Sequence, residues 1–364
     1  MIRRWIARII APLDAPLLGL ILSLMLLGLA VLFSASGKDL MTVIGQARSM
    51  LVALLGMCIL AHLPPQYLMR LAAPAYAFGL VMLIGVALFG EVSHGARRWL
   101  HLGPVRIQPS EFMKLALPLA LAAWFQYREE SLSFKDFLIA LLLFIVPVGL
   151  IAKQPDLGTA LLIASSGCFA LFLAGLSWRV IVLAATAGAA ALPVAWTFLH
   201  DYQRQRILTL INPASDPLGA GYHIIQSTIS VGSGGIFGKG WLSGTQAHLD
   251  FLPEPKTDFI FAVFCEEFGL LGELILLGLL VSLVIRGLRI AGHSSSVFNR
   301  IAAGSICLTL FTYTFVNMGM VAGILPVVGV PLPFISYGGT ALITLMLGQG
   351  ILMSISHHRT IVKR

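Results

Sequence analysis

The stretch DFLPEPKTDFIFAVFCEEFGL, residues 250–270, places a carboxylate, Asp258, directly ahead of a long apolar run. Such a run predicts a membrane-spanning helix, so Asp258 lies at its mouth, where bulk solvation falls away. An ionisable group near membrane depth raises the free energy of the fold unless something compensates, which makes it a candidate functional residue. The alternative is a helix N-cap formed by Thr257 or Asp258, with Glu266 and Glu267 at the membrane interface. The stretch alone leaves both interpretations open.

The composition around this stretch is that of a membrane protein. Of 364 residues, 58% are hydrophobic and only 11% are charged, which excludes a soluble globular protein. Much of the formal net charge of +8 falls in short basic clusters between apolar runs, which indicates topology signals and not nucleic-acid binding. The four cysteines lie in or beside apolar runs without CxxC spacing, which favours packing over a disulfide or metal site.

The apolar runs predict an all-α polytopic membrane protein with about ten transmembrane helices, because a span needs about 20 residues. The runs cover residues 16–34, 43–63, 71–90, 110–126, 136–152, 157–176, 179–199, 259–285, 300–322 and 337–356. An even number places both termini on one side of the membrane, and the long segment 200–257 lies between the seventh and eighth helices. The N-terminus lacks a cleavage pattern, so we expect an uncleaved chain whose first span is the insertion signal. We expect one transmembrane domain over residues 1–364, with segment 200–257 included.

Basic residues assign the two faces of the membrane. One face gathers Arg3, Arg4, Arg8, Arg70, Arg128, Lys135, Arg179, Arg286, Arg289, Arg300, Arg359, Lys363 and Arg364. By the positive-inside rule this face is cytoplasmic. Asp258 and segment 200–257 then face outward.

The outer face also carries cations that topology alone disfavours. They are Arg97, Arg98, Arg106, Lys153, Arg204, Arg206, Lys239 and Lys256. Long loops translocate regardless of charge, which accounts for the cations of 200–257. This explanation does not suit the cations of the short segments 91–109 and 153–156. We therefore expect these cations to interact with an anionic group outside the membrane or in its outer leaflet.

The segment EVSHGARRWLHLGPVRIQPSEFMK, residues 91–114, is too polar to span and leads into an apolar run. Pro109 and Ser110 resemble a helix start, with Glu111 in its first turn. Glu111 and Lys114 share one helix face and can pair. The pair either neutralises itself so that the helix can insert, or lines a polar cavity in which Lys114 meets a phosphate.

Two segments on the outer face carry polar residues whose role, structural or ligand-binding, the sequence does not decide. In AKQPDLGTA, residues 152–160, Lys153 and Asp156 flank a proline, which fits a tight turn or a ligand site equally well. In segment 200–257, HDYQRQRI predicts a short surface helix. The glycine cluster around Lys239 differs from a phosphate loop, since Ser233 and Gly240 stand at positions that the motif reserves for glycine and for serine or threonine. We interpret these glycines as turns and close backbone contacts whose N–H groups can hold an anion.

The run GMVAGILPVVGVPLPFISYGG, residues 319–339, interrupts an apolar stretch with three prolines and several glycines. A continuous helix is excluded there. Because broken backbone at membrane depth is tolerated only when it is buried in protein or lines a watery cavity, we expect this run to border the same outer cavity as Asp258. A plain loop between the last two spans is the alternative.

Taken together, RRWLHLGPVRIQPSE, KQPDLGTA, HDYQRQRI, DPLGAGYHIIQS, GSGGIFGKGW, LPEPKTDFIFAV and the 319–339 run resemble the SEDS (shape, elongation, division and sporulation) family of peptidoglycan polymerases, in particular its elongation members. The resemblance covers essentially the full length. It implies ten transmembrane helices and processive glycosyl transfer on lipid II, outside the bacterial cytoplasmic membrane. It also implies that Asp258 is catalytic and that Glu111 and Lys114 lie in the central cavity. The implied partners are a class B penicillin-binding protein and other membrane proteins of the elongation complex.

The residues suit this chemistry. A carboxylate in a partly desolvated cleft has a raised proton affinity, so Asp258 is the candidate base for the acceptor hydroxyl. The leaving diphosphate needs cations or N–H donors in place beforehand. The residues expected to bind substrate are Glu111, Lys114, Arg97, Arg98, Arg106, Lys153, Asp156, Arg204, Lys239, Lys256 and Ser336. No organic cofactor is expected, but a divalent cation (Mg²⁺ or Mn²⁺) held by Asp258 or Asp156 can do the same work.

Two other classes of function compete with a polymerase. A flippase of the lipid-linked precursor suits broken helices and intramembrane charge, although the polar motifs crowd one face. A membrane scaffold without chemistry would use Glu111 and Lys114 only to fix helix register.

Overall fold

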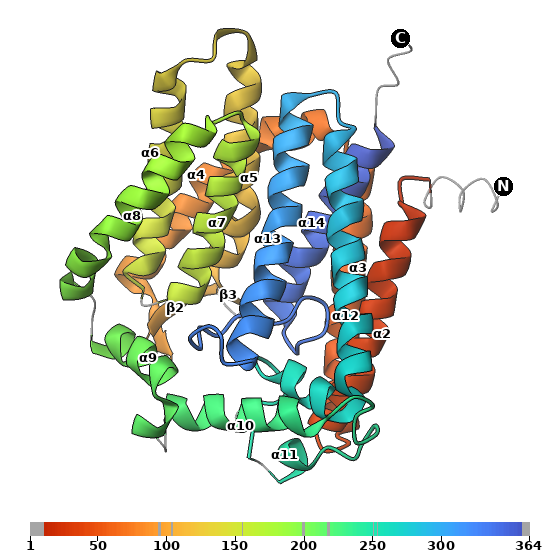
Figure 1. Cartoon of the computed structure of the whole chain (residues 1–364). Coiled ribbons are helices and arrows are strands. Elements are labelled where there is room, and N and C mark those ends of the chain that lie inside the picture. Colours follow the sequence, from red (N-terminus) through yellow and green to blue (C-terminus); the bar gives the residue numbers. More distant parts are fainter. Residues whose placement is uncertain are drawn as a thin grey trace, which may run out of the picture.

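The structure, a computed structural model, describes residues 11–358 except 94–95, 103–104, 155, 199–200, 217–218, 250 and 253. A helix stands at each of the ten predicted spans (Figure 1). They are α2 (Ala15–Ala35), α3 (Leu40–His62), α4 (Pro65–Phe89), α5 (Pro109–Tyr127), α6 (Phe134–Ala152), α7 (Leu157–Leu173), α8 (Trp178–Phe198), α12 (Ile260–Gly292), α13 (Val297–Val321) and α14 (Gly339–His357). Seven helices of the described residues are long and apolar enough to cross a membrane, and α7 and α8 contain shorter apolar segments.

The start of α2 and the end of α14 lie at the same end of the bundle, at the top of Figure 1. There Arg286 of α12 donates to both carboxylate oxygens of Asp14, at 3.0 and 2.6 Å. Ser356 of α14 donates to the same carboxylate at 3.2 Å, so one acidic side chain joins three helices. That this end is cytoplasmic stays a prediction, because the terminal residues on which it partly rests lie outside the described residues. Those residues are Arg3, Arg4, Arg8, Arg359, Lys363 and Arg364.

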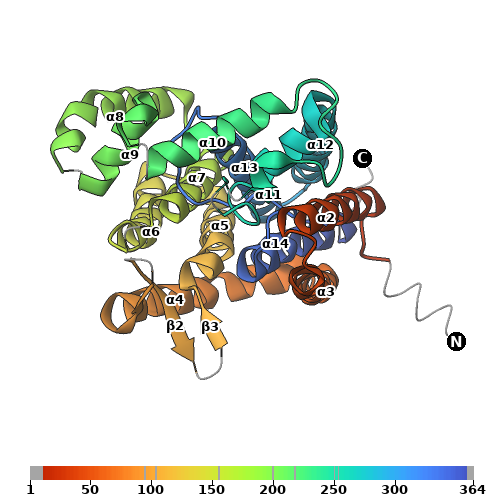
Figure 2. The same cartoon turned by 90° about the horizontal axis from the view of Figure 1, so that it is seen from below.

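The long segment between α8 and α12 folds over the opposite end of the bundle. It forms α9 (Asp201–Ile211), α10 (Ala220–Ser233) and the short α11 (Thr245–His248). The helix expected from HDYQRQRI is therefore confirmed in α9. Figures 1 and 2 show α10 lying across the ends of the bundle helices, near α7, α12 and α13.

The segment ahead of α5 adds a small sheet that the all-α prediction lacked. β1 (Glu91–Ser93), β2 (Ala96–Leu102) and β3 (Val105–Ile107) form an antiparallel meander. The sequence ARRWLHLGPVRI contains the aromatic and β-branched residues that favour strands, together with a Gly-Pro turn. This segment was interpreted from its sequence only as too polar to span the membrane. Its strand-forming residues therefore did not lead to a prediction of strands.

α12 consists of two helical halves joined at Gly269, which has φ 61° and ψ −167°. The glycine loop 234–240 lies against this break and takes up the hydrogen bonds that the helix gives up. Two loop N–H groups donate to the carbonyls of Glu266 and Glu267 at 3.0 Å each, and the first two N–H groups after Gly269 donate to loop carbonyls at 3.0 and 3.1 Å. A Cβ at Gly238 would lie 2.1 Å from the Glu267 carbonyl oxygen, so the backbones touch only because this residue is glycine.

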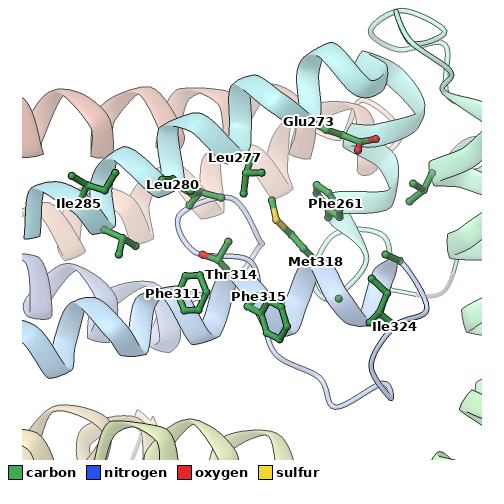
Figure 3. Close-up of a pocket in the computed structure, with 15 residues that line it drawn as sticks. Phe261, Glu273, Leu277, Leu280, Ile285, Phe311, Thr314, Phe315, Met318 and Ile324 are labelled. Carbon is green, nitrogen blue, oxygen red and sulfur yellow. The ribbon is translucent and has the colours of Figure 1, made fainter. Parts of the chain in front are cut away.

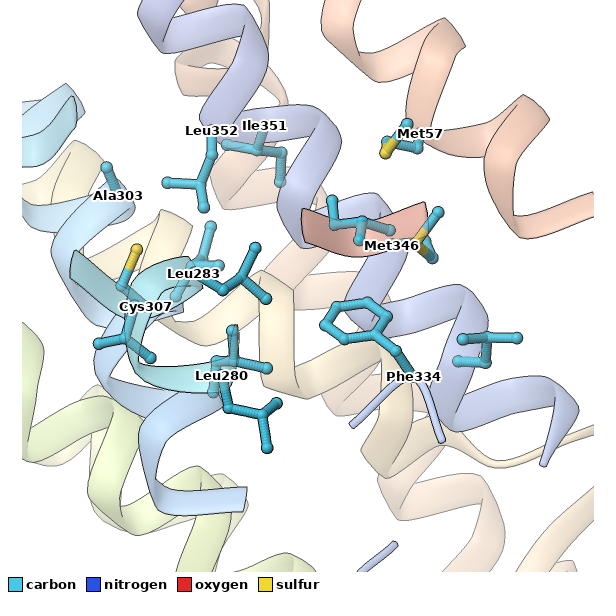
Figure 4. Packing of buried hydrophobic residues seen from close by; sticks show 14 of the residues in the cluster. Met57, Leu280, Leu283, Ala303, Cys307, Phe334, Met346, Ile351 and Leu352 are labelled. Carbon is cyan, nitrogen blue, oxygen red and sulfur yellow. The ribbon is translucent and has the colours of Figure 1, made fainter. Parts of the chain in front are cut away.

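The segment between α13 and α14 is not helical, as its prolines predict. It passes through the interior of the bundle, where a Cβ at Gly28 of α2 would lie 2.8 Å from the Cα of Ile335. Phe334, only 2% exposed, packs among buried side chains that include Met346 of α14 and Leu280 of α12 (Figure 4). The part of this broken backbone around Val330 to Ser336 is thus largely buried in protein, as an apolar membrane environment requires, whereas Ile324 and Tyr337 nearer its ends are exposed.

α8 stands apart from the other helices. Almost every one of its side chains that the structure describes is exposed. It lies at the outer edge of the molecule in Figure 2. Its apolar surface is therefore available to lipid on nearly all sides.

Candidate active site

Asp258 lies in the non-helical turn that leads into α12, and its backbone is held by the segment between α13 and α14. The Asn317 amide Nδ2 donates to the Asp258 carbonyl at 2.9 Å and to the Val330 carbonyl at 2.7 Å. A Cβ at Gly329 would lie 3.4 Å from Asp258 Oδ2. The proline- and glycine-rich run therefore lies beside Asp258. That the two border one outer cavity stays a prediction.

Asp258 does not cap the helix that follows it. α12 begins at Ile260 without a side-chain hydrogen bond at its N-cap, Phe259. The Thr257 hydroxyl donates to Glu254 instead, at 3.2 Å. The N-cap alternative for Thr257 or Asp258 is wrong, because the chain ahead of Ile260 is held by α13 and by the segment that follows it.

Ser336 holds the same turn from the other side. Its hydroxyl donates to the Thr257 carbonyl and accepts from the Leu332 N–H, both at 2.7 Å. The Tyr337 N–H donates to the Lys256 carbonyl at 2.9 Å. Ser336 is 5% exposed, and its hydroxyl bonds to the backbone groups of Thr257 and Leu332. It lies next to the candidate base, but direct contact with substrate stays a prediction.

The environment of Asp258 raises its affinity for a proton. Burial, and then the negative charge of Glu254, raise the pKa of Asp258 from 3.8 to about 6. Desolvation and a like charge both disfavour the ionised form. A carboxylate with this pKa is ionised at neutral pH and still basic enough to take a proton from a hydroxyl group.

A second polar cluster lies in the first turns of α5. Lys114 Nζ lies 2.5 Å from Glu111 Oε1, which confirms the predicted pair, and the lysine side chain is 4% exposed. The ammonium also lies 5.0 Å from the ring centre of Tyr313 on α13. The alternative of a self-neutralising pair remains open, because the contacts satisfy the buried charge without showing what else it meets.

Asp156 joins this cluster to the small sheet. Its carboxylate lies 3.6 Å from Arg98 Nε of β2 and 3.5 Å from Gln108 Nε2. It also accepts the Thr159 N–H at 3.2 Å and thereby caps α7, as the turn interpretation predicts. Asp156 lies within electrostatic reach of Tyr313 as well. The structure therefore brings Arg98, Asp156, Lys114 and Glu111 toward one region.

Other predicted cations lie elsewhere. Lys239 Nζ lies 2.6 Å from Glu266, and Arg204 donates to the Trp196 and Thr197 carbonyls at 3.0 and 2.8 Å. Lys153 is exposed at the end of α6, and Lys256 lies within electrostatic reach of Asp39. The backbones of Arg97 and Arg106 belong to β2 and β3, and their side chains lie outside the description. The described members of this group therefore lie apart from the Asp156 cluster, and their contact with substrate stays a prediction.

Comparison with known proteins places this arrangement in a family. The cell cycle protein family of FtsW, RodA and SpoVE matches residues 15–361. The chain belongs to the FtsW/RodA/SpoVE family. It is 52% identical over 353 residues to the peptidoglycan glycosyltransferase MrdB of Escherichia coli (strain K12), covering 97% of this chain and 95% of MrdB. It is 38% identical over 283 residues to a probable peptidoglycan glycosyltransferase FtsW of Geobacter metallireducens, covering 76% of this chain and 74% of that protein.

Solved structures show the same fold. A chain of a peptidoglycan synthase complex, described as coordinating polymerization and crosslinking, superposes with a TM-score of 0.82 at 34% identity and covers 94% of this chain and 97% of that one. The rod shape determining protein RodA of Thermus thermophilus superposes with a TM-score of 0.73 at 30% identity and covers 95% and 97%. This member of the FtsW/RodA/SpoVE family is thus an integral bacterial membrane protein.

Sequence reasoning missed several residues of this family member's site. Asn317 and Tyr313 lie in an apolar span, where a buried amide or phenol is a signal for a functional position. Glu254 stands in the opening stretch but was given no role. Glu266, expected at the membrane interface, is instead completely buried and accepts hydrogen bonds from Thr245 and from the Lys239 ammonium.

In the described part of the chain, the acidic residues of this family member do not form a metal site by themselves. Among the residues that the structure describes, no three His, Cys, Asp or Glu side chains gather closely enough to hold an ion. Asp258 with Glu254, or Asp156, offers the one or two carboxylates with which Mg²⁺ usually binds substrate phosphates. The carboxylates therefore fit a divalent cation that arrives with its substrate.

An apolar pocket of about 510 Å³ opens between α12 and α13 (Figure 3). Phe311, Phe315 and Met318 line it from α13, and Leu277 and Leu280 line it from α12. Glu273, just beyond the break in α12, is the charged residue among its lining. The pocket is distinct from the polar clusters around Asp258 and Lys114.

Proposed function

We propose that the chain is a peptidoglycan glycosyltransferase that polymerises lipid II into glycan strands on the outer face of the cytoplasmic membrane during cell elongation. The observation that carries this proposal is the Asp258 carboxyl group, whose pKa is raised to about 6 and whose backbone is fixed by Asn317. Family membership and the 52% identity to MrdB support the class of reaction.

Asp258 acts as the general base. It takes the proton of the acceptor sugar's 4-hydroxyl as that oxygen forms a bond to the anomeric carbon of the donor. The bond from this carbon to the diphosphate oxygen breaks, and the polyprenyl diphosphate leaves with the electron pair. Attack opposite the leaving group inverts the anomeric carbon, and product linkages of retained configuration would sink this part of the proposal.

The leaving diphosphate gains negative charge, which must be stabilised by cations or hydrogen-bond donors that are already positioned around it. Lys114 and Arg98 are the described cations of the cluster near Asp156, and an arginine can bind phosphate with two parallel hydrogen bonds. A divalent cation held by Asp258 with Glu254, or by Asp156, would neutralise the same charge. The remaining candidates for binding the anionic substrate are Lys153, Lys239, Lys256, Arg97, Arg106 and Arg204.

The partner in this proposal is a class B penicillin-binding protein, whose transpeptidase crosslinks the new strand. The similarity to a chain of a complex that coordinates polymerization and crosslinking supports it. Other membrane proteins of the elongation complex are expected around this pair.

The second candidate function is a flippase of the lipid-linked precursor, which the broken α12 and the broken segment before α14 favour. Reconstitution of the protein and its partner into liposomes with lipid II separates the two. A polymerase lengthens lipid II that is already on the outer leaflet. Translocation of lipid II without any lengthening would replace the proposal with the flippase.

A further inference from the structure

A second polar site lies behind Lys114, inside the bundle. A small cavity of about 20 Å³ opens between α5, α13 and α14. Its polar lining consists of Lys114, Tyr313, Thr309, Thr344 and Gln349. A cavity of this volume accommodates about one water molecule.

Gln349 makes this cavity more than a packing gap. The residue is 1% exposed, and neither its Oε1 nor its Nε2 has a hydrogen-bond partner among the described residues. A buried amide without partners is costly, so such groups are nearly always satisfied. A Cβ at Gly350 would lie 2.5 Å from the Met57 carbonyl oxygen, and one at Gly348 would lie 3.1 Å from Ile306. This close packing of α14 on both sides keeps the Gln349 amide inside the bundle.

The other lining groups supply the hydrogen bonds that a water molecule needs. The Lys114 ammonium has three N–H donors, of which one points to Glu111 Oε1 at 2.5 Å. The Thr309 and Thr344 hydroxyls donate to the Ser305 and Thr340 carbonyls, at 2.7 and 3.1 Å, which leaves their oxygen lone pairs as acceptors. A water molecule can accept from Lys114 and donate to Gln349 Oε1 or to a threonine oxygen. A metal cation is disfavoured, because the ammonium beside it repels positive charge.

We propose that this cavity binds one water molecule, which links the Gln349 amide to the Lys114 ammonium, and that Gln349 is a positioning residue for Lys114. The water keeps Nζ fixed beside Glu111 when substrate is bound. The positioning role rests on the proposed function of Lys114 toward the substrate phosphates, whereas the water site does not.

The water site is tested by a high-resolution structure of the protein in its complex with the penicillin-binding partner. We expect density within hydrogen-bond distance of both Gln349 and Lys114 Nζ, and its loss in Gln349→Met, which keeps the length of the side chain. A wild-type cavity without density, or a Gln349 amide turned to a protein partner, would overturn the water site.

The positioning role is tested by the kinetics of lipid II polymerisation. Loss of one hydrogen bond to a charged group predicts that Gln349→Met lowers kcat about tenfold, with KM little changed, because the charge on the leaving diphosphate develops in the transition state. The matched control is Gln66→Met at the exposed start of α4, which should have no effect.

The two proposals fail in different ways. A normal kcat in Gln349→Met, or an equal fall in Gln66→Met, would overturn the positioning role. Wild-type protein that makes no polymer at all would instead contradict the proposed function, and the density in the cavity would still decide the water site.

Discussion

The side chain of Asn317 holds the backbone of Asp258. Its Nδ2 donates to the Asp258 carbonyl at 2.9 Å and to the Val330 carbonyl at 2.7 Å, and the asparagine is completely buried. One amide thereby ties the turn before α12 to the segment after α13, on which Gly329 lies against the carboxylate. Both sides of the candidate base are fixed relative to each other, as a reaction that depends on orientation requires.

Asn317→Leu is expected to lower polymerisation of lipid II, because the two segments around Asp258 lose their common donor. A misplacement of about 1 Å can cost about a hundredfold in rate, so we expect a fall between about tenfold and a hundredfold. Polymer length and rate are measured on protein that still elutes as a folded complex with its partner. Asn212→Leu, an exposed asparagine ahead of α10, is the control. Full activity in Asn317→Leu would show that the amide does not position the base.

Polymerisation should rise with pH through about 6, because Asp258 must lose its proton to act as base and its pKa is raised to about 6. Glu254→Gln removes the like charge, lowers the pKa of Asp258 and moves this rise to lower pH. A pH profile of kcat/KM for both proteins measures the shift. Glu129→Gln, exposed beyond the end of α5, should leave the profile in place. A rise that stays fixed or moves upward in Glu254→Gln would contradict the account.

Asp258→Asn should make the folded protein more stable above pH 6. The pKa of Asp258 is raised from 3.8 to about 6, so the fold favours the neutral carboxyl. The stability that the neutral Asp258 carboxyl group contributes is fully present below pH 3.8 and is lost as the pH rises through about 6. At pH 8 we expect the substitution to raise the free energy of unfolding by about 1–3 kcal/mol. Thermal unfolding in detergent at pH 8 and pH 4 checks this, and an equal effect at both values would refute the ionisation argument.

Gly238→Ala should destabilise the protein, whereas Gly235→Ala should do so much less. Both glycines have positive φ, of 77° and 57°, so both substitutions carry similar backbone strain. A Cβ at Gly238 would lie 2.1 Å from the Glu267 carbonyl oxygen, but one at Gly235 meets nothing within 4 Å. We expect Gly238→Ala to cost at least about 2 kcal/mol more, through loss of the bonds across the break in α12. Thermal unfolding of the two variants side by side measures the difference, and equal midpoints would contradict the close contact.

Much of the membrane architecture could be predicted from apolar length alone. A helix stands at each of the ten apolar runs, because a bilayer fixes the length of the apolar segment that crosses it. The strands β1 to β3 could not be predicted in this way, since they are short and polar. The break at Gly269 was also missed, because the apolar run continues through it and only the loop 234–240 makes the break stable.

The candidate site was only partly predictable. The Glu111–Lys114 pair follows from helical spacing, and the position of Asp258 follows from its place ahead of an apolar run. The hydrogen bonds from Asn317 to the Asp258 carbonyl and from Ser336 to the Thr257 carbonyl could not be predicted from the sequence. They join residues that lie 59 and 79 positions apart along the chain. The pairing of Lys239 with Glu266 could not be predicted either, because these two residues lie 27 positions apart along the chain.

Asp258 is proposed to be the general base for the polymerisation of lipid II. The most direct test compares the wild-type protein with Asp258→Asn. Both proteins are purified with the penicillin-binding partner, and glycan strands from lipid II are measured at pH 7.5, with thermal unfolding as a check on folding. The account predicts strands from wild type and none from a variant that is folded, bound to its partner and at least as stable. Equal amounts of polymer from both proteins would remove Asp258 from the chemistry and contradict the account.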